Sequence, residues 1–174
     1  TDKEIVDAFS RIEEARGAVS LTYFEFAALA ALVIFEASEL DFVILEVGLG
    51  GRLDAVNIVN ASVAVITRID LDHQGWLGTS RGEISREKAG RIRSGCPVVI
   101  ADADPPPELT DCIIDVGSSP ALYLGRDFAV DESDGQWRAQ LRMPNGQLRT
   151  VAAATNGSLL PENIAAAVQA ALLL

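Results

Sequence analysis

The sequence predicts an α/β fold in which a mostly parallel sheet is flanked by helices and carries a small β-rich excursion. Mostly apolar runs at residues 42–47, 62–69 and 97–100 are typical of strands that are buried on both faces. A helical pattern at 81–93 lies between the second and third runs, as a right-handed crossover requires. With 174 residues and 49% hydrophobic content, the chain suits one compact domain and is too apolar to be disordered.

The first quarter of the chain predicts two helices, at residues 1–16 and 23–39. The first pattern ends at Arg16 and a glycine, which together form a stop signal. Thr22 is the expected N-cap of the second helix, and Glu25 three residues later completes a capping box. The glycine-rich residues 48–54 form a loop, and a second, polar loop is predicted at 70–80.

The second half predicts short strands and a final helix. The strands are expected at 112–116, 121–124, 127–130, 137–142 and 147–151. Pro144-Asn145-Gly146 is a hairpin signal between the last two, and Pro161 is suited to begin the final helix. The chain therefore divides into an α/β portion (1–104), a β-rich portion (105–158) and a returning helix (159–174). The chain starts without methionine and ends in an apolar helical run, so we expect a piece of a longer protein.

Charge and composition exclude several function classes. The formal net charge is 14 − 25 = −11, which opposes general binding to nucleic acid or to an anionic membrane. The longest apolar stretch, residues 24–40, contains three glutamates and is better explained as a buried or amphipathic helix than as a membrane span. Cys96 and Cys112 lack CxxC spacing, and no signal peptide opens the chain, so we expect reduced thiols and a cytoplasmic protein.

Charged side chains follow the predicted strands where ligands bind in open α/β sheets. Glu46 is the one charge in the apolar run 42–47, and a buried carboxylate there needs a cation or strong donors. Asp70, Asp72 and His73 follow the next strand. If the strands are neighbours, Glu46 and His73 could share a divalent metal. The alternatives are a Glu46 paired with a structural arginine and an ordinary loop histidine.

Two further features leave alternatives open. Lys88, on the predicted helix 81–93, is either an exposed helical lysine or a group aimed at the crevice. The GLGG run at 48–51 allows a close approach of the backbone to a ligand. It is not the dinucleotide fingerprint GxGxxG, and the chain contains no GxxxxGK[ST] phosphate loop.

Four motifs, taken in order, resemble those of bifunctional dihydrofolate synthase/folylpolyglutamate synthase, the folate branch of the Mur ligase superfamily. They are LTYFE at 21–25, LEVGLGGRLDA at 45–55, LDH at 71–73 and REKAG at 86–90. The resemblance runs almost without interruption to residue 100 and continues, more weakly, to the end. It implies a partial Mur-ligase-type central ATPase domain, with the phosphate loop upstream and a C-terminal domain downstream.

The resemblance implies an ATP-dependent ligase that adds L-glutamate to dihydropteroate and to folates through an acyl phosphate. ATP is the co-substrate, and two Mg²⁺ sites are expected in the whole enzyme, which is usually monomeric. The isolated piece is expected to be inactive. The alternatives are another Mur-type amide ligase and a non-catalytic folate- or nucleotide-binding module.

The resemblance also implies roles for particular residues. Glu46 and His73 correspond to magnesium ligands, and Lys88 to a catalytic lysine that relatives carry as N6-carboxylysine. Asn163 corresponds to an adenine contact. The implied pterin-binding residues are Thr22, Tyr23, Phe24, Glu25, Leu53, Asp54 and Ala55. Arg68 and Asp70 depart from the smaller, uncharged residues expected beside the LDH motif.

Overall fold

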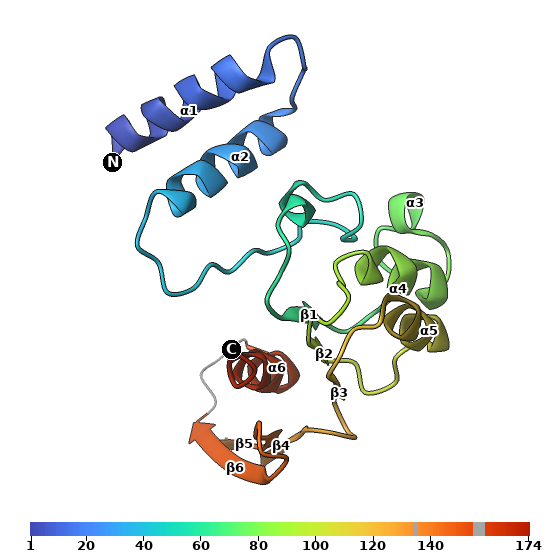
Figure 1. Cartoon of the computed structure of the whole chain (residues 1–174). Helices are drawn as coiled ribbons and strands as arrows, with labels where there is room; N and C mark the ends of the chain where they lie inside the picture. The colour runs from blue at the N-terminus through green and yellow to red at the C-terminus, as the bar shows by residue number, and fades with distance from the viewer. Residues whose placement is uncertain (134–135, 155–158) are drawn as a thin grey trace. The chain divides into compact units, whose positions relative to one another are not determined.

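A computed structural model of the chain describes residues 1–133, 136–154 and 159–174. The chain forms two compact units (Figure 1). Unit 1 comprises residues 1–49 and 54–58, and unit 2 comprises residues 50–53 and 59–174. No helix in the described ranges has both the length and the apolar character needed to cross a bilayer.

Apart from the strands expected at 42–47 and 112–116, the elements follow one another in the order that the sequence predicts. Unit 1 contains the helices α1 (Asp2–Arg16) and α2 (Tyr23–Glu36) and the short 3₁₀ helix η1 (Ala55–Ile58). The helices of unit 2 are α3 (Gln74–Leu77), α4 (Arg81–Ala89), α5 (Pro107–Val116) and α6 (Pro161–Ala171). Its strands are β1 (Ala64–Ile66), β2 (Val98–Ile100), β3 (Ala121–Tyr123), β4 (Ala129–Ser133), β5 (Gln136–Arg142) and β6 (Leu148–Ala154).

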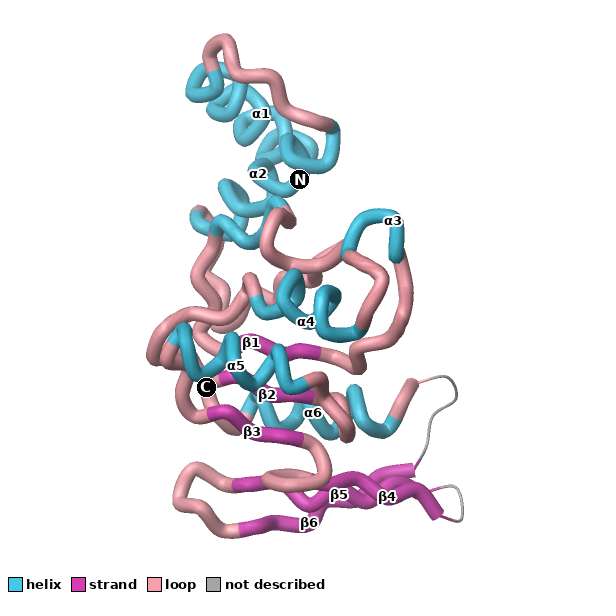
Figure 2. The backbone as a smooth tube through the Cα atoms, turned by 90° about the vertical axis from the view of Figure 1, so that its right-hand side faces the viewer, coloured by secondary structure: helices cyan, strands magenta, loops and turns pink. Residues whose placement is uncertain are grey.

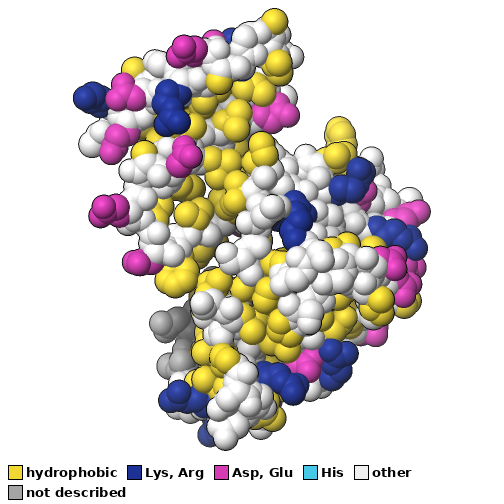
Figure 3. All heavy atoms as spheres, in the orientation of Figure 1, with side chains coloured by type: hydrophobic (Ala, Val, Ile, Leu, Met, Phe, Trp, Pro, Cys, Tyr) yellow, Lys and Arg dark blue, Asp and Glu magenta, His cyan; other side chains and the backbone are white. Residues whose placement is uncertain are grey.

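In unit 1, α1 and α2 pack as a helical pair. Ala8 and Ile12 of α1 are buried against Ala30 of α2, and Phe9 meets Phe26 edge to face with ring centroids 5.2 Å apart. Figure 3 shows charged side chains along the outer side of α1 and hydrophobic ones toward α2. The predicted capping box at the start of α2 is confirmed, although α2 ends three residues earlier than expected.

Unit 2 is built on a parallel sheet in the order β1-β2-β3, which confirms the predicted fold class. The side chains of β2 alternate between two cores. Val98 and Ile100 face α4 and α5, whereas Val99 faces α6, and all three are fully buried. Helices therefore lie on both faces of the parallel sheet (Figures 1 and 2), and the burial of β2 on both faces explains the apolar run at 97–100.

A second sheet, antiparallel in the order β4-β5-β6, packs on the other side of α6. Its central strand β5 alternates buried and exposed side chains, and Trp137, Ala139 and Leu141 face α6. The predicted hairpin turn is confirmed by a 2.8 Å hydrogen bond from Met143 N to Gln147 O. Burial alternates along β5 because its sheet is covered by α6 on one face only. Burial does not alternate along β2 because helices cover both of its faces.

The predicted strand at 112–116 is wrong, because these residues form the second half of α5. Pro107 stands in the first turn of this helix, Leu109 and Ile113 are buried four residues apart, and Gly117 ends the helix in a left-handed conformation. The helical spacing of the apolar residues is recognisable only if the whole segment from Pro107 is considered, and not 112–116 alone.

The predicted strand at 42–47 is also wrong, because no strand ladder of the described residues includes it. Phe42 and Ile44 are largely exposed in this extended segment. An apolar run indicates that a segment can enter a sheet, but a strand exists only where a neighbouring strand supplies its hydrogen bonds. The division of the chain at 104 and 158 stays a prediction, and residue 158 lies outside the described ranges.

Gln169 joins α6 to the antiparallel sheet and is fully buried. Its Oε1 accepts a 2.7 Å hydrogen bond from Arg142 N, and its Nε2 donates a 2.9 Å hydrogen bond to Arg142 O. Gln169→Leu would remove both bonds and should lower the free energy of unfolding by about 2 kcal/mol. Urea denaturation measures this, with the exposed Gln140→Leu as a control that should change it by less than about 0.5 kcal/mol. Equal stabilities of the two variants would contradict this role.

Candidate functional site

A cleft of about 510 Å³ lies at the carboxyl ends of the parallel strands of unit 2. Loops that follow β1, β2 and β3 line it together with the start of α6. Ligands bind at this edge in open α/β folds. The polar residues that line the cleft are Arg68, Asp70, Arg81, Asp102, Asp104, Glu162 and Asn163.

His73 lies at the end of the loop that follows β1 and is the N-cap of α3. Its backbone is left-handed, with φ 51° and ψ 38°, and it is the one non-glycine residue of positive φ in the described chain. Such a conformation costs energy and is concentrated at functional sites. His73 N donates a 2.7 Å hydrogen bond to Asp72 Oδ1. The side chain is about half exposed, with Nε2 3.5 Å from Asp72 Oδ2.

Two side chains of this loop are of types that bind divalent ions. Asp72 supplies a carboxylate oxygen and His73 an imidazole nitrogen, and both atoms are accessible. Within the described ranges, no group of three or more His, Cys, Asp or Glu side chains is placed to hold a metal. Glu46 belongs to unit 1 and His73 to unit 2, so their shared metal site stays a prediction.

Glu46 is exposed, since the segment that carries it is not a strand. The premise that its carboxylate is buried is therefore wrong, and desolvation gives no reason for a bound cation. The proposed role of Glu46 as a metal ligand depends on the resemblance alone.

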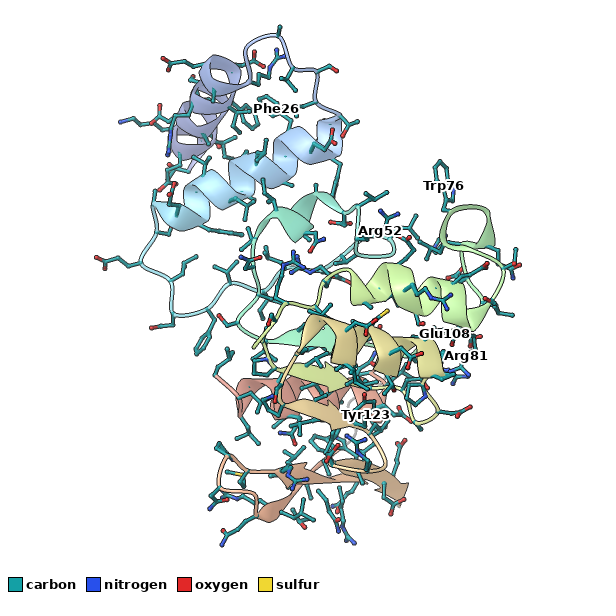
Figure 4. All side chains as sticks on the ribbon, turned by 45° about the vertical axis from the view of Figure 1, so that its right-hand side comes forward. Phe26, Arg52, Trp76, Arg81, Glu108 and Tyr123 are labelled. Carbon is teal, nitrogen blue, oxygen red and sulfur yellow. The ribbon has the colours of Figure 1, made fainter. Side chains whose placement is uncertain are left out.

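Arg81 and Asp102 form a cluster at the cleft that the sequence did not single out. Arg81 Nη2 lies 3.0 Å from Asp102 Oδ2 and donates a 2.8 Å hydrogen bond to Asp104 O. Figure 4 shows Arg81 at the start of α4, near Glu108. The signal that could have revealed the cluster is a pair of aspartates directly after the buried strand β2.

Lys88 lies near the end of α4 and is half-buried. The glycine-rich loop packs against this part of the helix. A Cβ on Gly51 would lie 3.1 Å from Lys88 O, and one on Gly90 would lie 2.5 Å from Arg52 Cα. Arg52 Nη2 is 3.0 Å from Glu87 Oε1, and Arg52 N donates a 2.9 Å hydrogen bond to Glu87 O. These glycines therefore permit a close approach to a helix.

The residues expected to bind the pterin lie in both units. At the start of α2, Tyr23 is almost fully exposed and Phe24 about half exposed. Asp54 Oδ2 accepts a hydrogen bond from Gly48 N and its Oδ1 accepts one from Val56 N. Ala55 begins η1, whereas Leu53 belongs to unit 2 and is largely exposed.

The capping boxes also lower the pKa of two carboxyl groups. Thr22 N and its hydroxyl donate to Glu25 Oε2, and these bonds lower the pKa of Glu25. Backbone N–H groups of Thr79 and Ser80 lower the pKa of Glu83 at the start of α4. Both cysteines are free, as expected, and burial raises the pKa of the Cys96 and Cys112 thiols.

Asn163 stands in the first turn of α6, which begins at Pro161 as predicted. Its side chain is exposed and lines the cleft with Asp70 and Arg81. Asn163 thus lies at the same edge of the sheet as the His73 loop, although the two residues are 90 positions apart in the sequence.

Known proteins resemble this chain in both sequence and structure. The dihydrofolate synthase/folylpolyglutamate synthase of Escherichia coli is 49% identical over 133 residues, which are 75% of this chain and 31% of that protein. The structure of E. coli FolC in complex with DHPP and ADP superposes with a TM-score of 0.87 and 40% identity, covering 99% of this chain and 40% of that one.

A third similar protein is the bifunctional folylpolyglutamate synthase/dihydrofolate synthase of Yersinia pestis, complexed with AMPPNP and Mn ion. Its TM-score is 0.84 with 38% identity, over 99% of this chain and 41% of that one. The chain spans 31% of the length of the curated E. coli relative. No protein-family model matches it.

Proposed function

The chain is homologous to the dihydrofolate synthase/folylpolyglutamate synthases over the segment that it spans, and we propose that it is part of such a ligase. The proposed reaction adds L-glutamate to dihydropteroate and to folates at the expense of ATP. The whole protein is proposed to act as a cytoplasmic monomer.

One observation carries this proposal. The loop that ends at His73 and the helix start that carries Asn163 are at the same edge of a parallel sheet, beside a cleft of about 510 Å³. The two structural relatives described above were solved with ADP or AMPPNP, so a nucleotide is the ligand class that fits this edge best.

From the resemblance, we propose that Asn163 contacts the adenine and that the segments 22–25 and 53–55 contact the pterin. His73 and Glu46 would hold a divalent ion, which we propose to be Mg²⁺. When bound, such an ion neutralises charge on the phosphoryl oxygens during transfer. Asp72 Oδ1 accepts a hydrogen bond from His73 N and so restrains the backbone of His73.

The proposed chemistry has two steps. A substrate carboxylate oxygen attacks the γ-phosphorus of ATP, an acyl phosphate forms and ADP leaves. The amine of L-glutamate then attacks the acyl carbon, the amide bond forms, and inorganic phosphate and a proton are released. Lys88, carried as N6-carboxylysine, would contribute an anion to a second metal site.

Because the chain spans about a third of the curated relative, we propose that it binds ligands but does not complete this reaction alone. A direct test uses NMR, since His73 is the one histidine of the chain and its Hε1 resonance needs no assignment by mutagenesis. Substoichiometric Mn²⁺ should broaden this resonance selectively, and AMPPNP should lower the Mn²⁺ concentration required. A His73 resonance that Mn²⁺ leaves unchanged would remove His73 as a ligand.

A further inference from the structure

We propose that Arg81 and Asp102 are positioning residues that hold the His73 loop in its binding geometry. The functional meaning of this inference rests on the proposed function, because that function makes His73 a metal ligand. Arg81, Asp102 and the His73 loop all belong to unit 2.

Arg81 and Asp102 both hydrogen-bond to the His73 loop at Ile69. Its N–H donates a 2.9 Å hydrogen bond to Asp102 Oδ2, and its carbonyl accepts a 2.8 Å hydrogen bond from Arg81 Nε. Both polar groups of one buried residue are thus bound by one ion pair, and Ile69 is only 1% exposed. The loop is therefore fixed four residues before His73.

The same pair joins three segments of the site. Arg81 begins α4, the helix of Lys88, and Asp102 follows β2. Arg81 Nη2 donates to Asp104 O, and Asp104 N donates a 2.9 Å hydrogen bond to Asp102 Oδ1. Asp102 is 4% exposed, so its carboxylate has little water available to replace these partners.

A compact turn connects the fixed residue to His73. Leu71 N donates to Asp70 Oδ1 at 2.8 Å, and Asp72 N donates to Asp70 O at 3.0 Å. The left-handed His73 then begins α3 through 2.8 Å and 3.1 Å bonds from Trp76 N and Leu77 N to its carbonyl. A strained residue persists only where its surroundings over-determine it, and the Arg81–Asp102 pair supplies one end of that constraint.

The chemistry of the pair explains why close substitutes should fail. Arg81 uses Nε for the loop carbonyl and Nη2 for Asp102 and Asp104, a fork that a lysine ammonium cannot reproduce. Both carboxylate oxygens of Asp102 accept backbone N–H groups, those of Ile69 and Asp104. Asp102→Asn would replace one of these oxygens by an NH₂ group, which would face an N–H donor and could not accept its hydrogen bond.

The test compares the NMR spectra of the Arg81→Lys variant and of the unaltered chain at a pH near 7.5, above the ordinary pKa of histidine. The His73 Hε1 resonance should shift or broaden in metal-free Arg81→Lys, and Mn²⁺ affinity should fall by about 10-fold or more, as for residues that orient metal ligands. The matched control is Arg126→Lys, which alters the 2.9 Å contact of Arg126 with Asp127 elsewhere in unit 2 and should leave both readings unchanged.

The resonance of the buried Trp137 indole reports whether each variant is folded. If Arg81→Lys does not fold, Asp102→Glu tests the same contacts, since it keeps the charge but displaces the carboxylate from Ile69 N. A folded variant of either kind with a His73 resonance like that of the unaltered chain would overturn the proposal. If Mn²⁺ leaves His73 unchanged in the unaltered chain, the metal role fails, while the metal-free comparison still decides the positioning role.

Discussion

Gly90→Ala should lower the free energy of unfolding by about 2 kcal/mol or more, because a Cβ at this position overlaps the backbone of the glycine-rich loop. The added carbon would lie 2.5 Å from Arg52 Cα and 2.4 Å from Arg52 Cβ. Neither atom is the end of a flexible side chain, so the loop itself must move. Such a movement would strain the 2.9 Å hydrogen bond from Arg52 N to Glu87 O.

Without a clash, alanine in place of Gly90 would stabilise the chain. Gly90 has φ −58° and ψ −9°, a conformation open to any residue, and alanine favours a helical backbone over glycine by up to about 1 kcal/mol. A gain is therefore expected where there is space. Gly75→Ala in α3 provides that control, because nothing lies within 4 Å of the added carbon. Urea unfolding measures the stability of both variants. A Gly90→Ala variant as stable as the unaltered chain would contradict the close packing of the glycine-rich loop against Gly90.

His73→Asn should reduce turnover at least about 100-fold in a complete enzyme, since even residues that only orient metal ligands contribute 10- to 100-fold. The complete enzyme is a chimera in which this chain replaces the matching segment of the E. coli relative. Asparagine tolerates the left-handed backbone of His73, so the imidazole is removed while the loop can keep its shape.

Gln74→Ala is the matched control for this substitution, because Gln74 is exposed on the same short helix. It should leave turnover within about two-fold of the unaltered chimera, as expected for a surface change. Phosphate release that depends on dihydropteroate and L-glutamate gives the rate. Equal rates for His73→Asn and Gln74→Ala would show that His73 is not needed for the metal-dependent step.

The sequence predicted those elements whose signals are local. The capping box of Thr22 and Glu25, Pro161 at the start of α6 and the turn at Pro144-Asn145-Gly146 were all found where expected. The buried run 97–100 predicted β2 because a strand covered on both faces has no polar side. Each of these depends on residues close together in the chain.

The predictions were wrong or incomplete where the structure depends on a longer sequence pattern or on a residue far away in the chain. Residues 112–116 are helical because their apolar positions continue a period that begins at Leu109. Residues 42–47 have the composition of a buried strand, yet pairing decides whether a strand forms. The Arg81–Asp102 pair joins residues 21 positions apart and meets Ile69, so no local pattern contains it.

The measurement that tests the central claim most directly is dihydrofolate formation by the chimera from dihydropteroate, ATP and L-glutamate. A chimera with the same junctions and the Yersinia pestis segment shows whether the junctions are tolerated. We expect this chain to support formation that requires both ATP and a divalent metal, and the chain by itself to form none. A folded chimera that forms no dihydrofolate, beside an active Yersinia pestis control, would contradict the assignment of this chain to a folate–glutamate ligase.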